Sequence, residues 1–163
     1  MDLTTDYFSL FEVQEQYALD LKQLKKAHRQ LQRQYHPDKV GDDLNSIRLS
    51  GHINSAYECL ISPTERAKYI AKRQGATLAE HNFADQPSYL MAQIELREEL
   101  SELANDEQVH SFIAKRDATL EELGAQFTQL ANATDWNNAA ITVGKMQFAE
   151  KLKAEAKQKL YAN

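Results

Sequence analysis

The 163-residue chain contains very little cysteine, glycine or proline, with one Cys, five Gly and three Pro. Its single cysteine, Cys59, excludes a disulfide within the chain and a cysteine zinc cage. Scarce Gly and Pro beside 26% charged residues favour long helices over a turn-rich β fold. No run approaches the roughly 18 apolar residues of a membrane span, and Met1 to Asp6 lack the features of a secretory signal. We expect an all-α, cytoplasmic protein.

Charge is divided unevenly along the chain. Residues 1–75 carry 11 Lys and Arg against 10 Asp and Glu, whereas residues 76–163 carry 8 against 14. The overall net charge of −5 disfavours a nucleic-acid binder. Residues 76–87 are polar and show no useful helical period, which is typical of a linker. We therefore expect two domains, 1–75 and 88–163, with different partners.

Apolar residues recur at helical spacing in both halves. In the first half, Asp20 is the expected N-cap of a helix over 21–35, and Pro37 must end it because proline lacks an N–H group. In the second half, we predict helices at about 88–104, 107–131 and 137–161. Three helices with short connections predict an antiparallel three-helix bundle.

A basic helical face leads into the triplet His36-Pro37-Asp38. The face consists of Lys25, Lys26, Arg29 and Arg33. Such a face can steer an acidic partner, Pro37 limits the entropy lost on docking, and Asp38 can accept two hydrogen bonds from a partner arginine. The alternative is a solvated helix face followed by an ordinary turn that Asp38 caps.

The wider pattern of residues 5–75 resembles a J domain. The matching features are Asp6-Tyr7-Phe8, the helix 21–35, His36-Pro37-Asp38-Lys39, the residues Asn54, Ala56, Tyr57 and Leu60, and the run Ser62–Tyr69. The resemblance implies that His36, Pro37 and Asp38 dock onto the ATPase of a DnaK-type chaperone and accelerate its hydrolysis. The basic helix face would support this docking.

The segment 89–103 has two distinct faces on a helical wheel. The first is a core stripe, formed by Tyr89, Leu96, Leu100 and Leu103. The second combines apolar with acidic residues, namely Leu90, Met91, Ile94, Glu95, Glu98 and Glu102. An apolar anchor with a charged rim predicts a binding surface. The alternative is that its apolar residues pack against the linker or the N-terminal domain.

The second half resembles the C-terminal bundle of HscB, the J-type co-chaperones of iron–sulfur cluster assembly. The resemblance rests on Leu90–Leu100, on Trp136-x-x-Ala139-Ala140 and on Lys145–Leu152. It implies that the ATPase partner is HscA and that the bundle binds the cluster scaffold IscU. The residues implied to contact the scaffold are Leu90, Met91, Ile94, Glu95, Glu98, Glu102 and Phe148. The spacing of Phe148 also suits a plain core position.

No catalytic or metal-ligating pattern is present. The five histidines form no H-E-x-x-H or similar pair, and Cys59 reads as a buried, inert thiol. There is no glycine-rich phosphate loop, and the cysteine-rich metal module of eukaryotic relatives is missing, so neither metal nor cofactor is implied. We expect an adaptor without enzymatic activity of its own. The alternative is a J-domain adaptor that recruits a different client or only regulates an ATPase.

The substitution His36→Gln tests the J-domain assignment. Because the loop is expected to be exposed, the variant should keep its circular dichroism spectrum and melting temperature. It should fail to stimulate a DnaK-type ATPase, measured as phosphate release. Stimulation at the wild-type level would contradict the assignment.

Overall fold

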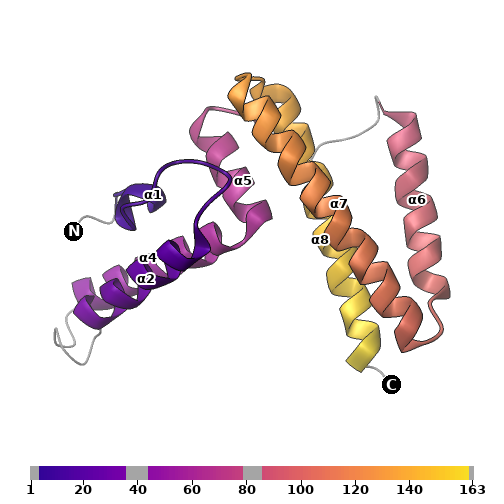
Figure 1. Cartoon of the computed structure of the whole chain (residues 1–163), viewed down its shortest axis with the longest axis horizontal. Coiled ribbons are helices and arrows are strands. Elements are labelled where there is room, and N and C mark those ends of the chain that lie inside the picture. The colour runs from indigo at the N-terminus through magenta and orange to yellow at the C-terminus, as the bar shows by residue number, and fades with distance from the viewer. Residues whose placement is uncertain (1–3, 36–43, 79–85, 162–163) are drawn as a thin grey trace. The chain divides into compact units, whose positions relative to one another are not determined.

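The computed structural model describes residues 4–35, 44–78 and 86–161 (Figure 1). Every regular element within these ranges is a helix, which confirms the all-α expectation. The chain divides into two compact units, Met1–Ile70 and Ala71–Asn163. Each unit packs its helices around its own set of buried apolar side chains and therefore has its own core.

The first unit is built on a pair of helices that lie side by side (Figure 1). Its helices are α1 (Tyr7–Leu10), α2 (Leu21–Tyr35), α4 (Leu44–Ile61) and α5 (Pro63–Arg73), and the boundary between the units falls within α5. The pair is α2 and α4. Asp20 Oδ1 accepts the backbone N–H groups of Lys22 at 2.8 Å and Gln23 at 3.2 Å, so α2 begins where its capping residue predicts.

Aromatic stacking joins the elements of the first unit. The Tyr7 and Tyr69 rings stack with centroids 4.5 Å apart, and the Tyr69 hydroxyl accepts the backbone N–H of Tyr7 at 3.0 Å. His28 stacks on Tyr57 at 3.9 Å between α2 and α4. The largest buried side chains here are Phe8, Phe11, Leu24, Ile53 and Leu60. His28 is therefore a packing residue, and α2 is fixed on α4 through one side only.

The second unit contains three long helices. They are α6 (Pro87–Glu102), α7 (Asp106–Asn132) and α8 (Trp136–Tyr161). Figure 1 shows α7 and α8 side by side over most of their length. Small buried residues at this contact, Gly124, Ala139, Ala140 and Ala149 among them, allow the two backbones to approach closely. The long pair forms a platform for α6.

Helix α6 packs on the other two helices through an apolar stripe, and a cation of α8 binds its C-terminal end. Leu100 is buried in a cluster with Val109, Phe112 and Leu152, and Leu96 and Leu103 pack against the same cluster. At the end of α6, Lys159 Nζ donates to the carbonyl oxygens of Ser101 at 3.1 Å and Leu103 at 3.4 Å. A cation at a helix C-terminus satisfies free carbonyls and suits the helix dipole.

Among the described residues, three helix ends are followed by a residue in the left-handed region. Glu12 follows α1 with φ +53°, Gly75 follows α5 with φ +79° and Thr134 follows α7 with φ +56°. The N–H of Thr134 donates to Ala131 O at 3.0 Å, and the N–H of Asp135 donates to Leu130 O at 2.9 Å, which is a Schellman arrangement. Threonine carries a steric cost in this conformation that glycine lacks.

The half-buried Cys59 lies near the end of α4. Its thiol donates to the carbonyl of Glu65 with a sulfur–oxygen distance of 3.6 Å. Burial, followed by the charge of Glu65, raises the pKa of the Cys59 thiol to about 11. The thiolate fraction at pH 7 is then on the order of one in ten thousand. This sulfur is not activated for nucleophilic chemistry, since the thiolate is the reactive form.

Replacing Thr134 with glycine should stabilise the second unit. Removing the Cβ relieves the left-handed strain, so the free energy of unfolding in urea should rise by about 0.5–1 kcal/mol. Ala133, with φ −83°, is the matched control, because Ala133→Gly only adds unfolded-state entropy there and should destabilise. Equal destabilisation by Thr134→Gly and Ala133→Gly would contradict the left-handed backbone conformation of Thr134.

Alkylation of Cys59 should be slow in the folded chain and strongly pH-dependent. At pH 7.5, iodoacetamide should label Cys59 roughly a hundredfold more slowly in the folded chain than in urea, because the thiol stays protonated and half-buried. The folded-state rate should rise about tenfold per pH unit until the pH approaches the raised pKa. Equal labelling rates with and without urea would contradict a protonated, half-buried Cys59 thiol in the folded chain.

Candidate protein-interaction surfaces

The outward face of α6 is apolar at its start. Met91 and Ile94 expose 57% and 51% of their surface, and Leu90 is partly buried. At about 100° per residue, these three side chains lie on the side of α6 away from Leu96 and Leu100, which face the core. Because the core stripe packs against the other helices, Leu90, Met91 and Ile94 are turned toward solvent.

The same face becomes acidic farther along α6. Glu95, Glu98 and Glu102 are exposed. Within the part of the chain that the structure describes, no Lys or Arg is paired with any of these three carboxylates. The neighbouring charges on the flanks are paired, since Glu99 meets Lys115 at 3.2 Å and Arg97 meets Glu155 at 3.7 Å. The α6 face, defined as Leu90, Met91, Ile94, Glu95, Glu98 and Glu102, thus has an apolar end and an uncompensated acidic end.

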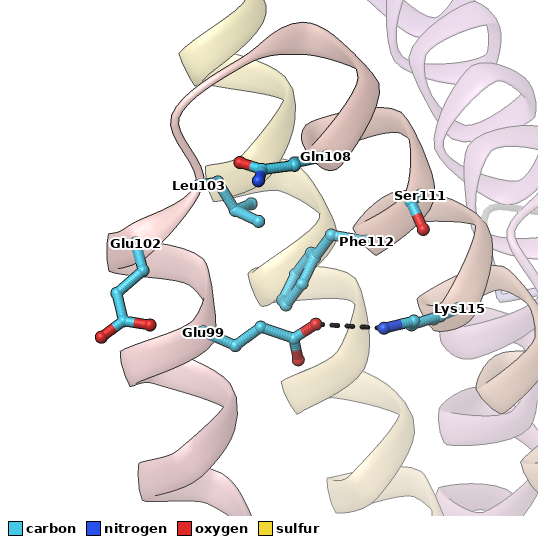
Figure 2. Close-up of a pocket in the computed structure, with 7 residues that line it drawn as sticks. All are labelled: Glu99, Glu102, Leu103, Gln108, Ser111, Phe112 and Lys115. Atoms are coloured by element: carbon cyan, nitrogen blue, oxygen red, sulfur yellow. Dashed lines mark hydrogen bonds and ion pairs between the residues drawn. The ribbon is translucent and has the colours of Figure 1, made fainter.

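A cleft of about 290 Å³ lies beside the acidic end, between α6 and α7. Its lining residues are Glu99, Glu102, Leu103, Gln108, Ser111, Phe112 and Lys115. Figure 2 shows Phe112 pointing into the bundle below Leu103, while Glu99 reaches across to Lys115 and Glu102 points away from that pair. The α7 residues of this cleft were missed in the sequence because their approach to α6 depends on the register of the two helices.

Phe148 lies at the edge of the core. Its ring meets Tyr89 edge-on with centroids 6.4 Å apart, and the Arg97 guanidinium lies 5.5 Å from its centroid. It packs partly buried against the cluster around Leu100. Phe148 contacts Tyr89, the residue before Leu90, and therefore lies beside the α6 face. It also packs against the core.

The first unit presents the predicted basic face along α2. Lys25, Lys26, Arg29 and Arg33 are exposed and line a shallow groove of about 450 Å³ together with Lys22 and Gln30. Among the described residues, no carboxylate is paired with any of these cations. Because α2 packs on α4 through its opposite side, around Leu24, the basic side faces solvent.

The triplet His36, Pro37 and Asp38 lies outside the described residues, so its role stays a prediction. Helix α2 extends to Tyr35, the residue immediately before the triplet, and α4 begins at Leu44. The basic face is therefore continuous in sequence with the triplet.

Neither a metal site nor a membrane span is found where the structure is described. In residues 4–35, 44–78 and 86–161, no three His, Cys, Asp or Glu side chains gather in a metal-binding arrangement. Within the same ranges, no helix has both the length and the low polarity that crossing a bilayer requires.

Comparisons with known proteins agree with these two units. Residues 6–69 match the DnaJ domain model, and residues 85–157 match the model described as the HSCB C-terminal oligomerisation domain. The chaperone HscB from Vibrio cholerae is 31% identical, with 97% of this chain and 99% of that chain covered and a TM-score of 0.84.

More distant structures share the fold. Human co-chaperone HscB is 24% identical, with 100% of this chain and 86% of that chain covered and a TM-score of 0.90. The Jac1 co-chaperone from Saccharomyces cerevisiae is 22% identical, with 97% and 95% covered and a TM-score of 0.77. Both family models and the Vibrio cholerae relative support the same family assignment. The chain belongs to the HscB family, the J-domain co-chaperones of iron–sulfur cluster assembly.

Proposed function

We propose that this chain stimulates the ATPase of HscA, a DnaK-type chaperone, and delivers the iron–sulfur scaffold IscU to it. The proposed domains are a J domain at 1–75, a linker at 76–87 and a scaffold-binding bundle at 88–163. The observation that carries the proposal is the exposure of Met91 and Ile94 beside three carboxylates on one helix of the bundle, none of which pairs with a Lys or Arg among the described residues.

The ATPase end of the proposal is the basic face of α2 and the triplet His36-Pro37-Asp38. Cations that are exposed and unpaired keep their charge available for long-range steering of an acidic partner. Steering of this kind acts mainly on the association rate and weakens as salt is added. The triplet would then supply the specific contact, because Asp38 can hold a partner arginine with two hydrogen bonds.

The scaffold end is the α6 face. Side chains such as Met91 and Ile94 contribute binding energy when a partner covers them, since each then leaves water. Methionine adapts to the shape of a partner surface because it is unbranched and polarizable. Unpaired carboxylates at Glu95, Glu98 and Glu102 favour a scaffold that presents Lys or Arg beside an apolar patch. Phe148 would help to position this surface, because its ring packs against Tyr89 next to Leu90.

The two surfaces act together because one chain carries both. A client bound to the bundle is held near the chaperone that the J domain engages, so its effective concentration there rises without any new contact. The chain itself performs no chemical step in this scheme. Hydrolysis takes place on the partner, and the chain contributes docking and positioning.

Replacing both exposed apolar residues tests the scaffold end. The variant Met91→Ala/Ile94→Ala should bind IscU at least tenfold more weakly by titration calorimetry, because about 1.4 kcal/mol corresponds to that factor and two anchors are lost. Its melting temperature should stay unchanged, since neither side chain belongs to the core cluster.

The matched control is Tyr161→Ala, which removes an 88% exposed apolar side chain at the end of α8. This control should bind IscU with the wild-type affinity. Unchanged affinity in the double variant, with normal binding by the control, would favour an adaptor for a different client.

A further inference from the structure

One charge interrupts the apolar stripe of α7. Arg116 follows Val109 and Phe112 at the spacing of that stripe, and only 8% of its surface is exposed. Its guanidinium lies 4.9 Å from the centroid of the Phe112 ring, and its Nε has no hydrogen-bond partner. Within the described residues, no carboxylate is paired with it. A largely buried cation without a counter-charge is costly, because burial removes part of the water that would otherwise stabilise the charge.

Arg116 also lines a cavity of about 150 Å³ between the three helices of the second unit. Most of the remaining lining is apolar, and includes Leu96, Leu123, Phe148 and Leu152. A second cation, Lys145, lines the same cavity, and its Nζ lies 5.0 Å from the centroid of the Tyr89 ring. Lys145 has no carboxylate partner among the described residues. The cavity thus combines an apolar wall with two uncompensated positive charges.

This combination selects a specific ligand chemistry. A protein cavity of about this volume with an apolar lining can hold one benzene ring. A neutral hydrocarbon would leave Arg116 unpaired, and acetate would leave the apolar wall uncovered. A carboxylate on a compact apolar body satisfies both requirements, because guanidinium binds carboxylate with two charge-assisted hydrogen bonds. We propose that this cavity binds a small organic acid of that class, through Arg116 and Lys145.

The site can be tested separately from the proposed function, because it uses none of the six residues of the α6 face, although Tyr89 and Phe148, which the proposed function places next to that face, also line the cavity. It does bear on that face, since Tyr89 and Leu96 belong to α6, while Arg116 and Lys145 belong to α7 and α8. A ligand that contacts all three helices stabilises their assembled state by mass action. The carboxylate has two possible sources, a free metabolite acid or an acidic side chain presented by a client protein.

Benzoate is the probe, applied to the full chain at constant ionic strength. Saturable shifts of amide resonances around the cavity and a rising melting temperature are expected with benzoate. Benzyl alcohol, which lacks the charge, and acetate, which lacks the ring, should each bind at least about tenfold more weakly. Absence of saturable benzoate binding, or equal binding of benzyl alcohol, would overturn the proposal.

The variant Arg116→Met separates a binding role from a structural one. Replacing an unpaired buried charge with an apolar stem of similar length should leave the melting temperature equal or higher. The Kd for benzoate should rise at least about tenfold. The matched control Lys151→Met, an exposed cation on α8 outside the cavity, should keep the wild-type Kd. An unchanged Kd in Arg116→Met would show that Arg116 serves packing alone and would refute the site.

A competition experiment then identifies the source of the carboxylate. If IscU displaces benzoate and Arg116→Met weakens IscU binding, the client presents the acid. If benzoate remains bound in the presence of IscU, the ligand is a free acid. Both results support the site, and the Met91→Ala/Ile94→Ala variant tests the scaffold surface separately, because it should keep benzoate binding intact.

Discussion

The packing of α6 through one narrow stripe is the constraint on which the proposed client surface depends. Leu96, Leu100 and Leu103 press against α7 and α8, and Lys159 holds the last carbonyls of the helix. Because side chains on a helix keep fixed angles to one another, this attachment also orients the opposite side. Met91 and Ile94 are exposed for that reason, and the core stripe therefore acts as the support of the α6 face.

The two units differ in the charges that they leave without a partner. In the second unit, several cations lie over aromatic rings or pair on the flanks of the bundle, as Arg97, Arg116 and Lys153 do. The three carboxylates of the α6 face receive none of them among the described residues. In the first unit, the cations of α2 are equally uncompensated. Among the described residues, each unit therefore has one helix face with uncompensated charges, the basic face of α2 and the acidic end of the α6 face.

Local signals predicted the helices, whereas contacts between distant residues could not be read from the sequence. The expected helices at 88–104, 107–131 and 137–161 agree with α6, α7 and α8 to within two residues, because Asn105 and Asp135 cap the last two and short polar turns divide them. The two faces of α6 followed from helical periodicity. The edge position of Phe148, the cleft beside Glu102 and the cavity at Arg116 depend on how three helices align, which spacing alone does not determine.

The central claim is that the ATPase surface and the client surface are separate, and one titration tests it directly. Hydrolysis by an HscA-type ATPase is measured against added chain, with and without IscU, for the wild type and for Met91→Ala/Ile94→Ala. We expect the variant to stimulate hydrolysis like the wild type when IscU is absent and to lose only the increment that IscU adds. Loss of stimulation without IscU, or an IscU increment equal to that of the wild type, would contradict the account.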